Sequence, residues 1–219
     1  MTSPEDADVR RTAGPHGIAD AIVALAVRGF YQPGQRLKEQ DLAEHFSVSR
    51  LPVREALTEL ASQGVLDSSP RRGMRLMQID GFKLRKVLEV RERLETLALR
   101  TALPMFRTEP ASMAPLDTAI EEMAEASDVN DRVGIAIADM AFHRALCVAS
   151  GNEVLVKAWS AVSRQMLIIV GAEQQERPTN YPHVEIHKSL RKVLAESAIE
   201  DAEKALSDHI LRHWVIARR

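Results

Sequence analysis

The strongest constraint on the fold is the helical spacing of apolar residues, which continues from Asp80 to the C-terminus without an alternating strand pattern. Only 4% of the residues are aromatic, so aliphatic side chains and Met must fill the core. This composition favours helices over strands. We expect helices over residues 80–102, 113–126, 131–149, 152–170, 182–196 and 200–217, with breaks at residues 104, 110, 127–128, 150–152 and 177–180.

The N-terminal part of the chain shows a different order of elements. An amphipathic helix over residues 18–26 is followed by a turn, a short amphipathic segment and a second helix that begins near Ser49. Two short strand patterns, residues 65–66 and 74–77, then flank a turn rich in Arg, Ser, Pro and Gly. This order is that of a winged helix-turn-helix, in which the hairpin forms the wing.

The length of 219 residues accommodates two domains. We expect a flexible tail over residues 1–14, a winged helix-turn-helix over residues 15–77 and a helical domain over residues 81–217. The predicted fold class is therefore mainly α, with a short β-hairpin wing in the first domain and an all-helical bundle in the second.

Charge and cysteine content limit the classes of function. The formal net charge is −2, and residues 1–79 hold ten basic and ten acidic residues, so a DNA-binding surface must come from the placement of charges. The single cysteine, Cys147, excludes a disulfide framework, favours the cytoplasm and is expected to be a small buried residue. The apolar stretches are judged too short to span a bilayer, and the N-terminus does not resemble a signal peptide, so no membrane partner is expected.

The second helix of the N-terminal motif carries the side chains suited to DNA. Arg50 and Arg54 are four residues apart and project from one helix face, while Ser49 is expected to cap the helix. Arg suits both guanine edges and phosphates, although two such residues on a helix are often only a solvated face. The segment 68–76 holds three Arg, including Arg71 and Arg72, and no acidic residue, which strengthens the DNA-binding interpretation.

The predicted helical domain contains a possible metal site. Asp139 and His143 are spaced to share one helix face, and His187 and His209 occur on two later helices. One carboxylate and three imidazoles suit Zn, Ni, Mn or Fe. Buried structural histidines are the ordinary alternative, and spacing alone does not separate His187 from His183, or His209 from His213.

Residues 15–77 resemble the GntR family of bacterial regulators. The resemblance is carried by the run Pro33 to Leu37, by Glu39 and Leu42-Ala43, by the run Val48 to Leu57, and by Leu60, Gly64 and Arg72-Gly73. It implies that Arg50 and Arg54 contact operator DNA, with Arg36 and Gly73 nearby. Leu51 replaces the Thr that is usual in the family, so we expect the operator preference to differ.

Residues 81–215 look like the FCD ligand-binding domain of the FadR-type branch of that family. The similar stretches are Glu89-Val90-Arg91 with Leu94-Glu95, residues 139–143, residues 150–152, Glu185-Ile186-His187 and residues 207–210. The resemblance implies that Asp139, His143, His187 and His209 bind a divalent metal. A carboxylate effector then completes the coordination.

Three further residues are candidates for the effector site. Arg91 could clamp an organic acid bidentately, or it could form an ordinary surface pair with Glu95. Asn152 could contact the effector or only cap a helix, and Arg164 is a weaker candidate on a later helix.

Together these features predict a transcriptional regulator that binds operator DNA as a homodimer and responds to a small organic acid. The first alternative is a metal-dependent hydrolase or lyase that uses the Asp/His3 site, but no His-Glu-x-x-His motif supplies a general base. The second alternative is a regulator in which the metal is only structural.

Overall fold

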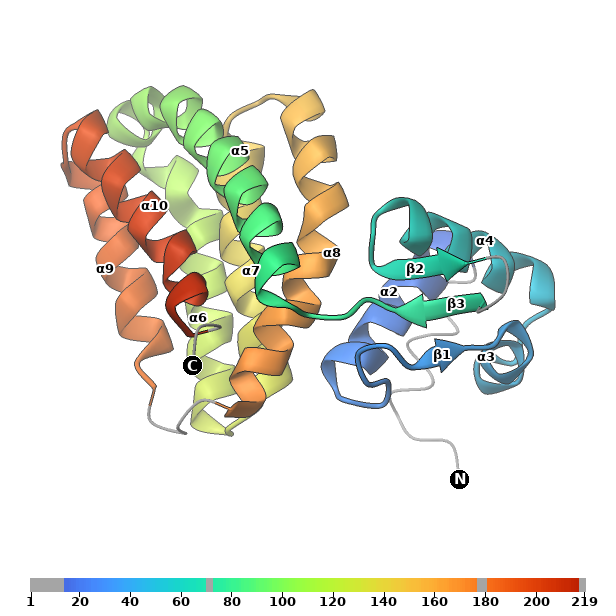
Figure 1. The fold of residues 1–219 in the computed structure, drawn as a ribbon. Helices are drawn as coiled ribbons and strands as arrows, with labels where there is room; N and C mark the ends of the chain where they lie inside the picture. The colour runs from blue at the N-terminus through green and yellow to red at the C-terminus, as the bar shows by residue number, and fades with distance from the viewer. Residues whose placement is uncertain (1–13, 70–72, 177–180, 217–219) are drawn as a thin grey trace. The chain divides into compact units, whose positions relative to one another are not determined.

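The computed structural model describes residues 14–69, 73–176 and 181–216, and the chain divides into two compact units, residues 1–79 and 80–219 (Figure 1). The predicted tail falls almost wholly outside the described residues, as do Arg71 and Arg72. The predicted fold class is confirmed, because each unit has the expected type of architecture.

The N-terminal unit is a winged helix-turn-helix (Figure 1). Its elements are α2 (Pro15–Val27), β1 (Arg36–Leu37), α3 (Glu39–Phe46), α4 (Arg50–Ser62), β2 (Leu66–Ser69) and β3 (Gly73–Leu76). The strands form an antiparallel sheet in the order β1-β3-β2. The pairing of Arg36 with Arg75 and of Leu37 with Met74 makes β1 a third strand, which the sequence pattern did not predict.

A buried apolar core holds α4 in place. Its apolar face contributes Val53, Leu57 and Leu60, and α4 packs against α2, α3 and β2. Ser47 adopts a left-handed conformation at the end of α3, with φ of 54°, and so makes the tight turn into α4. With this face of α4 buried, its polar residues face outward.

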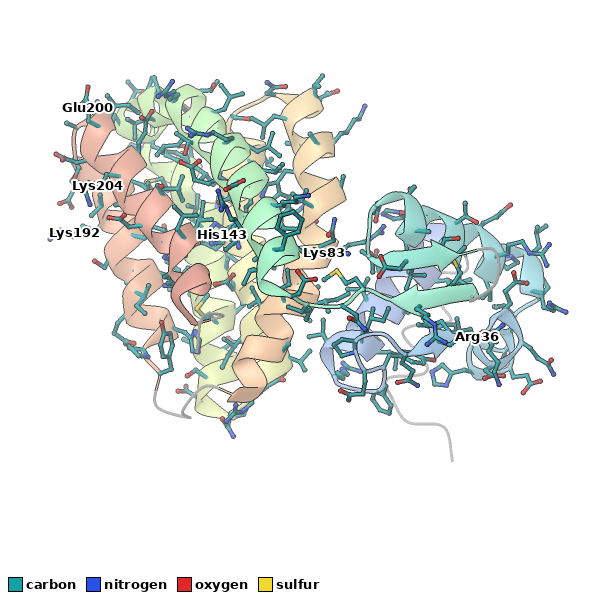
Figure 2. The ribbon with its side chains drawn as sticks, viewed as in Figure 1. Arg36, Lys83, His143, Lys192, Glu200 and Lys204 are labelled. Atoms are coloured by element: carbon teal, nitrogen blue, oxygen red, sulfur yellow. The ribbon has the colours of Figure 1, made fainter. Side chains whose placement is uncertain are left out.

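The C-terminal unit consists of helices alone in the part of the chain that the structure describes (Figure 1). They are α5 (Gly81–Thr108), a 3-10 turn (Pro110–Met113), α6 (Ala114–Asp128), α7 (Arg132–Ala149), α8 (Glu153–Glu176), α9 (His183–Glu196) and α10 (Ile199–Ile216). Helix α7 contacts α5, α6 and α8, and α5 also contacts α9 and α10. Lys192, Glu200 and Lys204 lie on the exposed faces of α9 and α10, whereas His143 lies inside the bundle (Figure 2).

The C-terminal end of α5 differs from expectation. Helix α5 does not break at Pro104 but continues to Thr108. Proline removes only its own N–H, and the apolar residues on both sides of it, Leu103 and Phe106, remain buried and keep the helix packed.

Residues 153–172 of α8 are long and apolar enough to span a bilayer, which corrects the expectation that no such stretch exists. Leu155, Trp159 and Met166 of this stretch are buried within the unit, which is the behaviour of a core helix.

Candidate functional site

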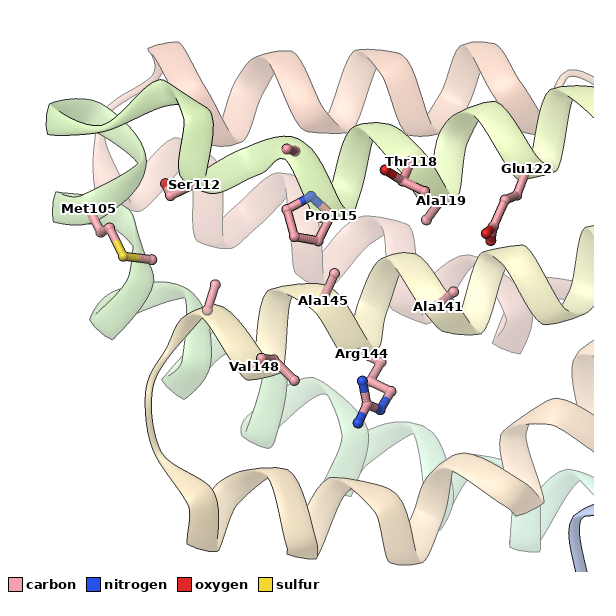
Figure 3. Close-up of a pocket in the computed structure, with 12 residues that line it drawn as sticks. Met105, Ser112, Pro115, Thr118, Ala119, Glu122, Ala141, Arg144, Ala145 and Val148 are labelled. Carbon is pink, nitrogen blue, oxygen red and sulfur yellow. The ribbon is translucent and has the colours of Figure 1, made fainter. Parts of the chain in front are cut away.

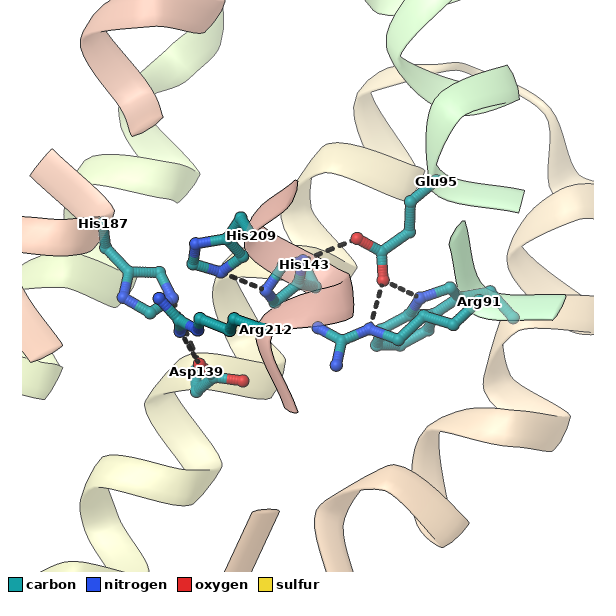
Figure 4. A network of polar contacts seen from close by, with 8 residues as sticks. Arg91, Glu95, Asp139, His143, His187, His209 and Arg212 are labelled. Carbon is teal, nitrogen blue, oxygen red and sulfur yellow. Dashed lines mark hydrogen bonds and ion pairs between the residues drawn. The ribbon is translucent and has the colours of Figure 1, made fainter. Parts of the chain in front are cut away.

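The four predicted metal ligands converge in the interior of the helical unit (Figure 4). Asp139 and His143 come from adjacent turns of α7, His187 comes from α9 and His209 from α10. All four side chains are buried, and one potential ligand atom from each lies within 4.8 Å of the others. Donors on opposite sides of one ion are about 4.2 Å apart, since metal–nitrogen bonds are about 2.1 Å long, so this cluster is close to the size that an ion requires.

The start of α7 is fixed by local contacts that place Asp139 and His143. Asp131 caps the helix through hydrogen bonds that its Oδ1 accepts from the backbone N–H groups of Val133 and Gly134, at 3.1 and 3.0 Å. A Cβ atom at position 134 would lie 2.6 Å from Asp131 Oδ2 and 2.9 Å from Ala126 Cβ. Only glycine therefore allows this tight start.

Hydrogen bonds orient two of the imidazoles toward the centre of the cluster. The carbonyl of His183 can only accept, so the Nδ1 of His187, 2.8 Å away, must carry a proton. The Nε2 of His187 then lies 3.1 Å from Asp139 Oδ1. A lone pair facing a carboxylate is unfavourable, so this contact requires either a second proton on His187 or a cation between the two groups.

His143 is oriented in the same way by Glu95. Its Nδ1 lies 2.6 Å from Glu95 Oε2, and its Nε2 lies 3.2 Å from His209 Nε2. Burial opposes ionisation of Glu95, but the adjacent His143 and Arg91 outweigh it and lower its pKa to about 2. Burial and the nearby Arg91 lower the pKa of His143 to about 4. At neutral pH the carboxylate therefore accepts from Nδ1, and Nε2 keeps the lone pair that a metal ligand needs.

The other two ligands are also in the state that a cation prefers. Burial and Arg212 lower the pKa of His209, so its imidazole is neutral. Burial opposes ionisation of Asp139, but the hydrogen bond from His187 and the neighbouring positive groups hold its pKa well below the usual value. Three imidazoles and one carboxylate are a donor set that fits a divalent transition metal, for which the protein supplies the donors and their orientation.

Glu95 is the centre of a buried network that sequence reasoning missed (Figure 4). Its Oε1 accepts hydrogen bonds from Arg91 Nε at 2.7 Å and from Trp159 Nε1 at 2.9 Å. Arg91 and Glu95 are both fully buried, so the alternative of a surface pair is wrong. An i,i+4 pair has the same sequence spacing on either face of a helix, which is why the pattern could not separate the two possibilities.

The buried guanidinium of Arg91 is only partly satisfied. Its Nε donates to Glu95, but neither Nη1 nor Nη2 has a hydrogen-bond partner among the described residues, and the same holds for Asp139 Oδ2. Unpartnered buried polar atoms are rare and costly. These atoms therefore mark a place where a polar ligand would be stabilised.

The remaining effector candidates have different positions. Arg164 is buried on α8. Asn152 is exposed, and its Oδ1 accepts from the backbone N–H groups of Val154 and Leu155, at 3.1 and 3.0 Å, so it caps α8, which is the alternative role given for it above. Arg212, three residues after His209, was missed although the i,i+3 spacing places it near the cluster, and its Nη2 lies 3.7 Å from Asp139 Oδ1.

A hollow of about 540 Å³ lies elsewhere on the helical unit, between α6 and α7 (Figure 3). It is lined by the opposite face of α7 from the one that carries Asp139 and His143, including Ala141, Arg144 and Val148. None of the predicted site residues lines it.

The DNA-binding candidates of α4 are exposed, as the prediction requires. Arg50, Leu51 and Arg54 all lie on the surface, and Leu51 is 61% exposed, which is unusual for a large apolar side chain. Ser49 occupies the N-cap position, but its hydroxyl makes no capping hydrogen bond, which corrects one detail of the prediction. The two arginines share Glu39 of α3 as an ion-pair partner.

The pairing of β1 with β3 brings Arg36 close to the wing residue Gly73. Arg36 is exposed on β1, and a Cβ atom at Gly73, whose φ is +69°, would lie 3.1 Å from Arg36 Nε. Glycine is thus favoured by the backbone conformation, and a side chain at this position would also displace the guanidinium of Arg36 slightly. Arg75 has a structural role instead, since its Nη1 donates to the carbonyl of Gly34 at 2.7 Å.

Comparison with known proteins identifies both units. Residues 16–76 match the family model described as bacterial regulatory proteins, gntR family, and residues 86–212 match the FCD domain. The "Probable D-xylose utilization operon transcriptional repressor" of Paenarthrobacter nicotinovorans is 30% identical over 207 residues, which are 94% of this chain and 88% of that protein. The chain belongs to the GntR family. It is a transcriptional regulator with an FCD domain and not an enzyme.

Further similarities extend over most of this GntR regulator. The Glc operon transcriptional activator of Escherichia coli K12 is 27% identical, over 88% of this chain and 84% of that protein. The solved structure of Escherichia coli McbR/YncC superimposes with a TM-score of 0.78 at 22% identity, and the match covers 92% of this chain and 95% of that one. This structural likeness supports the fold. Nothing in the comparisons supports the hydrolase or lyase alternative.

We predict that Glu95→Gln destabilises the regulator by about 3–5 kcal/mol, because it removes the carboxylate with which the buried guanidinium of Arg91 is paired. Urea unfolding of the helical unit measures the change. The matched control is Glu89→Gln, which breaks the pair of the same spacing with Arg85 on the exposed face of α5 and is expected to change little. Equal effects of the two substitutions would contradict the importance of the buried network.

Proposed function

We propose that this regulator binds operator DNA through residues 15–77 and senses a small carboxylate at a metal centre in residues 81–217. The observation that carries the effector proposal is the buried Arg91, whose unpartnered Nη1 and Nη2 lie in the same network as the four-ligand cluster. The regulator acts in the cytoplasm, where the DNA is.

The proposed DNA surface is the exposed face of α4 together with the wing. Arg50 and Arg54 project from adjacent turns of α4 and reach base edges or phosphates in the major groove. The exposed Leu51 offers an apolar contact, which suits the methyl group of thymine, and Ser49 offers a hydroxyl to a phosphate. Arg36 of β1 and the wing residues Arg71, Arg72 and Gly73 complete the proposed surface.

The proposed metal centre consists of Asp139, His143, His187 and His209. The support for it is the burial of all four side chains and the hydrogen bonds that direct the Nε2 atoms of His143 and His187 into the cluster. A bound divalent ion supplies positive charge that attracts a carboxylate. Zn, Ni, Mn and Fe all suit this donor set.

The proposed effector is a small organic acid. Arg91 offers two nitrogens in the fork geometry that matches a carboxylate. Arg212, whose Nη2 lies 3.7 Å from Asp139 Oδ1, is a further basic group at the cluster, and Arg164 is buried on α8. A neutral ligand would offer Nη1 and Nη2 of Arg91 no charged acceptor.

In a homodimer, binding of the effector to the helical unit is coupled to binding of the operator by the N-terminal unit. Two copies of α4 bind two half-sites of a palindromic operator, and the effector biases the arrangement of the copies. Light scattering of the full chain with and without operator tests the stoichiometry, and one protomer per operator would contradict this part of the proposal.

We predict that Arg50→Ala or Arg54→Ala weakens operator binding by about 1–3 kcal/mol, because each removes a guanidinium from the DNA surface. Fluorescence anisotropy with an operator selected by the wild-type protein measures the loss. Arg93→Ala on α5 removes the same charge from an 85% exposed side chain of the helical unit and is the control. Full binding by the double variant Arg50→Ala, Arg54→Ala would refute the assignment of α4.

We predict that His187→Ala lowers the bound divalent metal well below the wild-type content, while operator binding without effector is retained. Elemental analysis of the purified protein measures the metal. His183→Ala is the matched control, because its backbone carbonyl still orients His187 and its own ring lies against Tyr181. Metal content unchanged in His187→Ala, or lowered equally in both variants, would count against the site.

We predict that acetate, lactate, succinate or citrate raises the melting temperature of the wild-type protein, whereas the corresponding amide does not. At a concentration 100 times its Kd, a bound acid stabilises the protein by about 2.7 kcal/mol. Arg91→Lys keeps the charge but loses the bidentate fork, so its response should be much smaller. A response to acids that is equal in wild type and Arg91→Lys, or equal for acids and amides, would favour a regulator in which the metal is only structural.

A further inference from the structure

The two arginines of α4 are held by a single carboxylate from α3. Glu39 Oε1 accepts from Arg54 Nε at 3.0 Å, and Glu39 Oε2 accepts from Arg54 Nη2 at 2.9 Å and from Arg50 Nη2 at 3.3 Å. The contact with Arg54 is therefore bidentate, and that with Arg50 is a single hydrogen bond. These bonds connect residues on the two helices of the helix-turn-helix.

The carboxylate of Glu39 is restrained by its position at the start of α3 and by its partial burial. Glu39 is the first residue of α3, where the helix dipole favours an anion. Its side chain is 29% exposed, whereas those of Arg50 and Arg54 are 63% and 58% exposed. The hydrogen bonds from Arg54 lower the pKa of Glu39, so the carboxylate is ionised at neutral pH. The anchored carboxylate thus restrains two more exposed guanidinium groups.

The bidentate contact determines which part of Arg54 remains for DNA. A guanidinium has a side edge, Nε with Nη2, and an end edge, Nη1 with Nη2. Glu39 accepts from the side edge, so the end edge keeps one hydrogen on each of its nitrogens for another partner. Two parallel donors of this spacing match O6 and N7 of guanine in the major groove.

We infer that Glu39 is a positioning residue that makes Arg54 selective for guanine. This inference rests on the proposed role of α4 in operator binding. The carboxylate fixes the orientation of the guanidinium before DNA arrives and also repels phosphates, which disfavours the unspecific contacts that a mobile Arg would make. Glu39 itself does not need to touch the DNA.

The test compares three full-length proteins: wild type, Glu39→Gln and Glu44→Gln. The Gln at position 39 accepts through one oxygen only and presents an amide NH2 to the other donor, so the bidentate contact is lost. Glu44 lies on the same helix and accepts from Gln40 Nε2 at 3.0 Å, so Glu44→Gln removes the same charge while leaving the two arginine contacts in place. Thermal unfolding of each variant checks that it is folded.

Each protein selects from a library of random double-stranded DNA, and the bound fraction is sequenced. The wild-type protein is expected to enrich a motif with at least one fixed guanine per half-site. In Glu39→Gln, the preference for that guanine over the other bases should fall about 10-fold, with the rest of the motif retained. Glu44→Gln should keep the wild-type motif and bind every sequence somewhat more tightly.

Three results would overturn the inference. If Glu39→Gln selects the wild-type motif with the same guanine preference, Glu39 acts only as a negative charge that weakens all binding. If Glu44→Gln loses the guanine preference to the same extent, the loss results from the change in net charge and not from the broken contact between Glu39 and Arg54. If the wild-type protein enriches no motif, the proposed role of α4 fails, and this inference fails with it.

Discussion

The interaction on which the helical unit depends is the buried contact of Glu95 with Arg91, His143 and Trp159. One carboxylate accepts from three donors on three helices, α5, α7 and α8, so it ties together the elements that surround the cluster. It also fixes the tautomer of His143, because an ionised carboxylate at Nδ1 directs the lone pair of Nε2 toward His209. Burying these charges is tolerable only while each keeps its partner, which is why the network is both a structural and a functional element.

A carboxylate also restrains arginine side chains at the surface of the N-terminal unit. There a carboxylate on α3 holds two guanidinium groups of α4, as Glu95 holds Arg91 in the interior. The two networks differ in their exposure to solvent. Glu39, Arg50 and Arg54 are accessible to a polyanion such as DNA, whereas Arg91 is accessible only to a molecule that enters the helical unit. In both places the acid restricts one part of the arginine and leaves another part for a ligand.

Much of this arrangement could be predicted from spacing along the chain. Asp139 with His143, and Arg50 with Arg54, share helix faces, and the structure places each pair on one side of its helix. Spacing could not show which face of α5 is buried, so the network of Glu95 was missed, together with Trp159, which approaches from a distant part of the chain. The short strand β1 has no periodicity of its own, since it exists only through pairing with β3. The continuation of α5 through Pro104 likewise depends on tertiary packing that local rules do not contain.

X-ray absorption at the zinc edge, on the zinc-loaded full-length protein, tests the proposed metal centre most directly. We expect three imidazole nitrogens and carboxylate oxygen around the ion, at about 2.0–2.2 Å, with no sulfur. Burial raises the pKa of the nearby Cys147 thiol, which keeps it protonated and outside the ligand set. Zinc bound by sulfur, or by fewer than three imidazoles, would contradict the assignment of Asp139, His143, His187 and His209 as the metal centre.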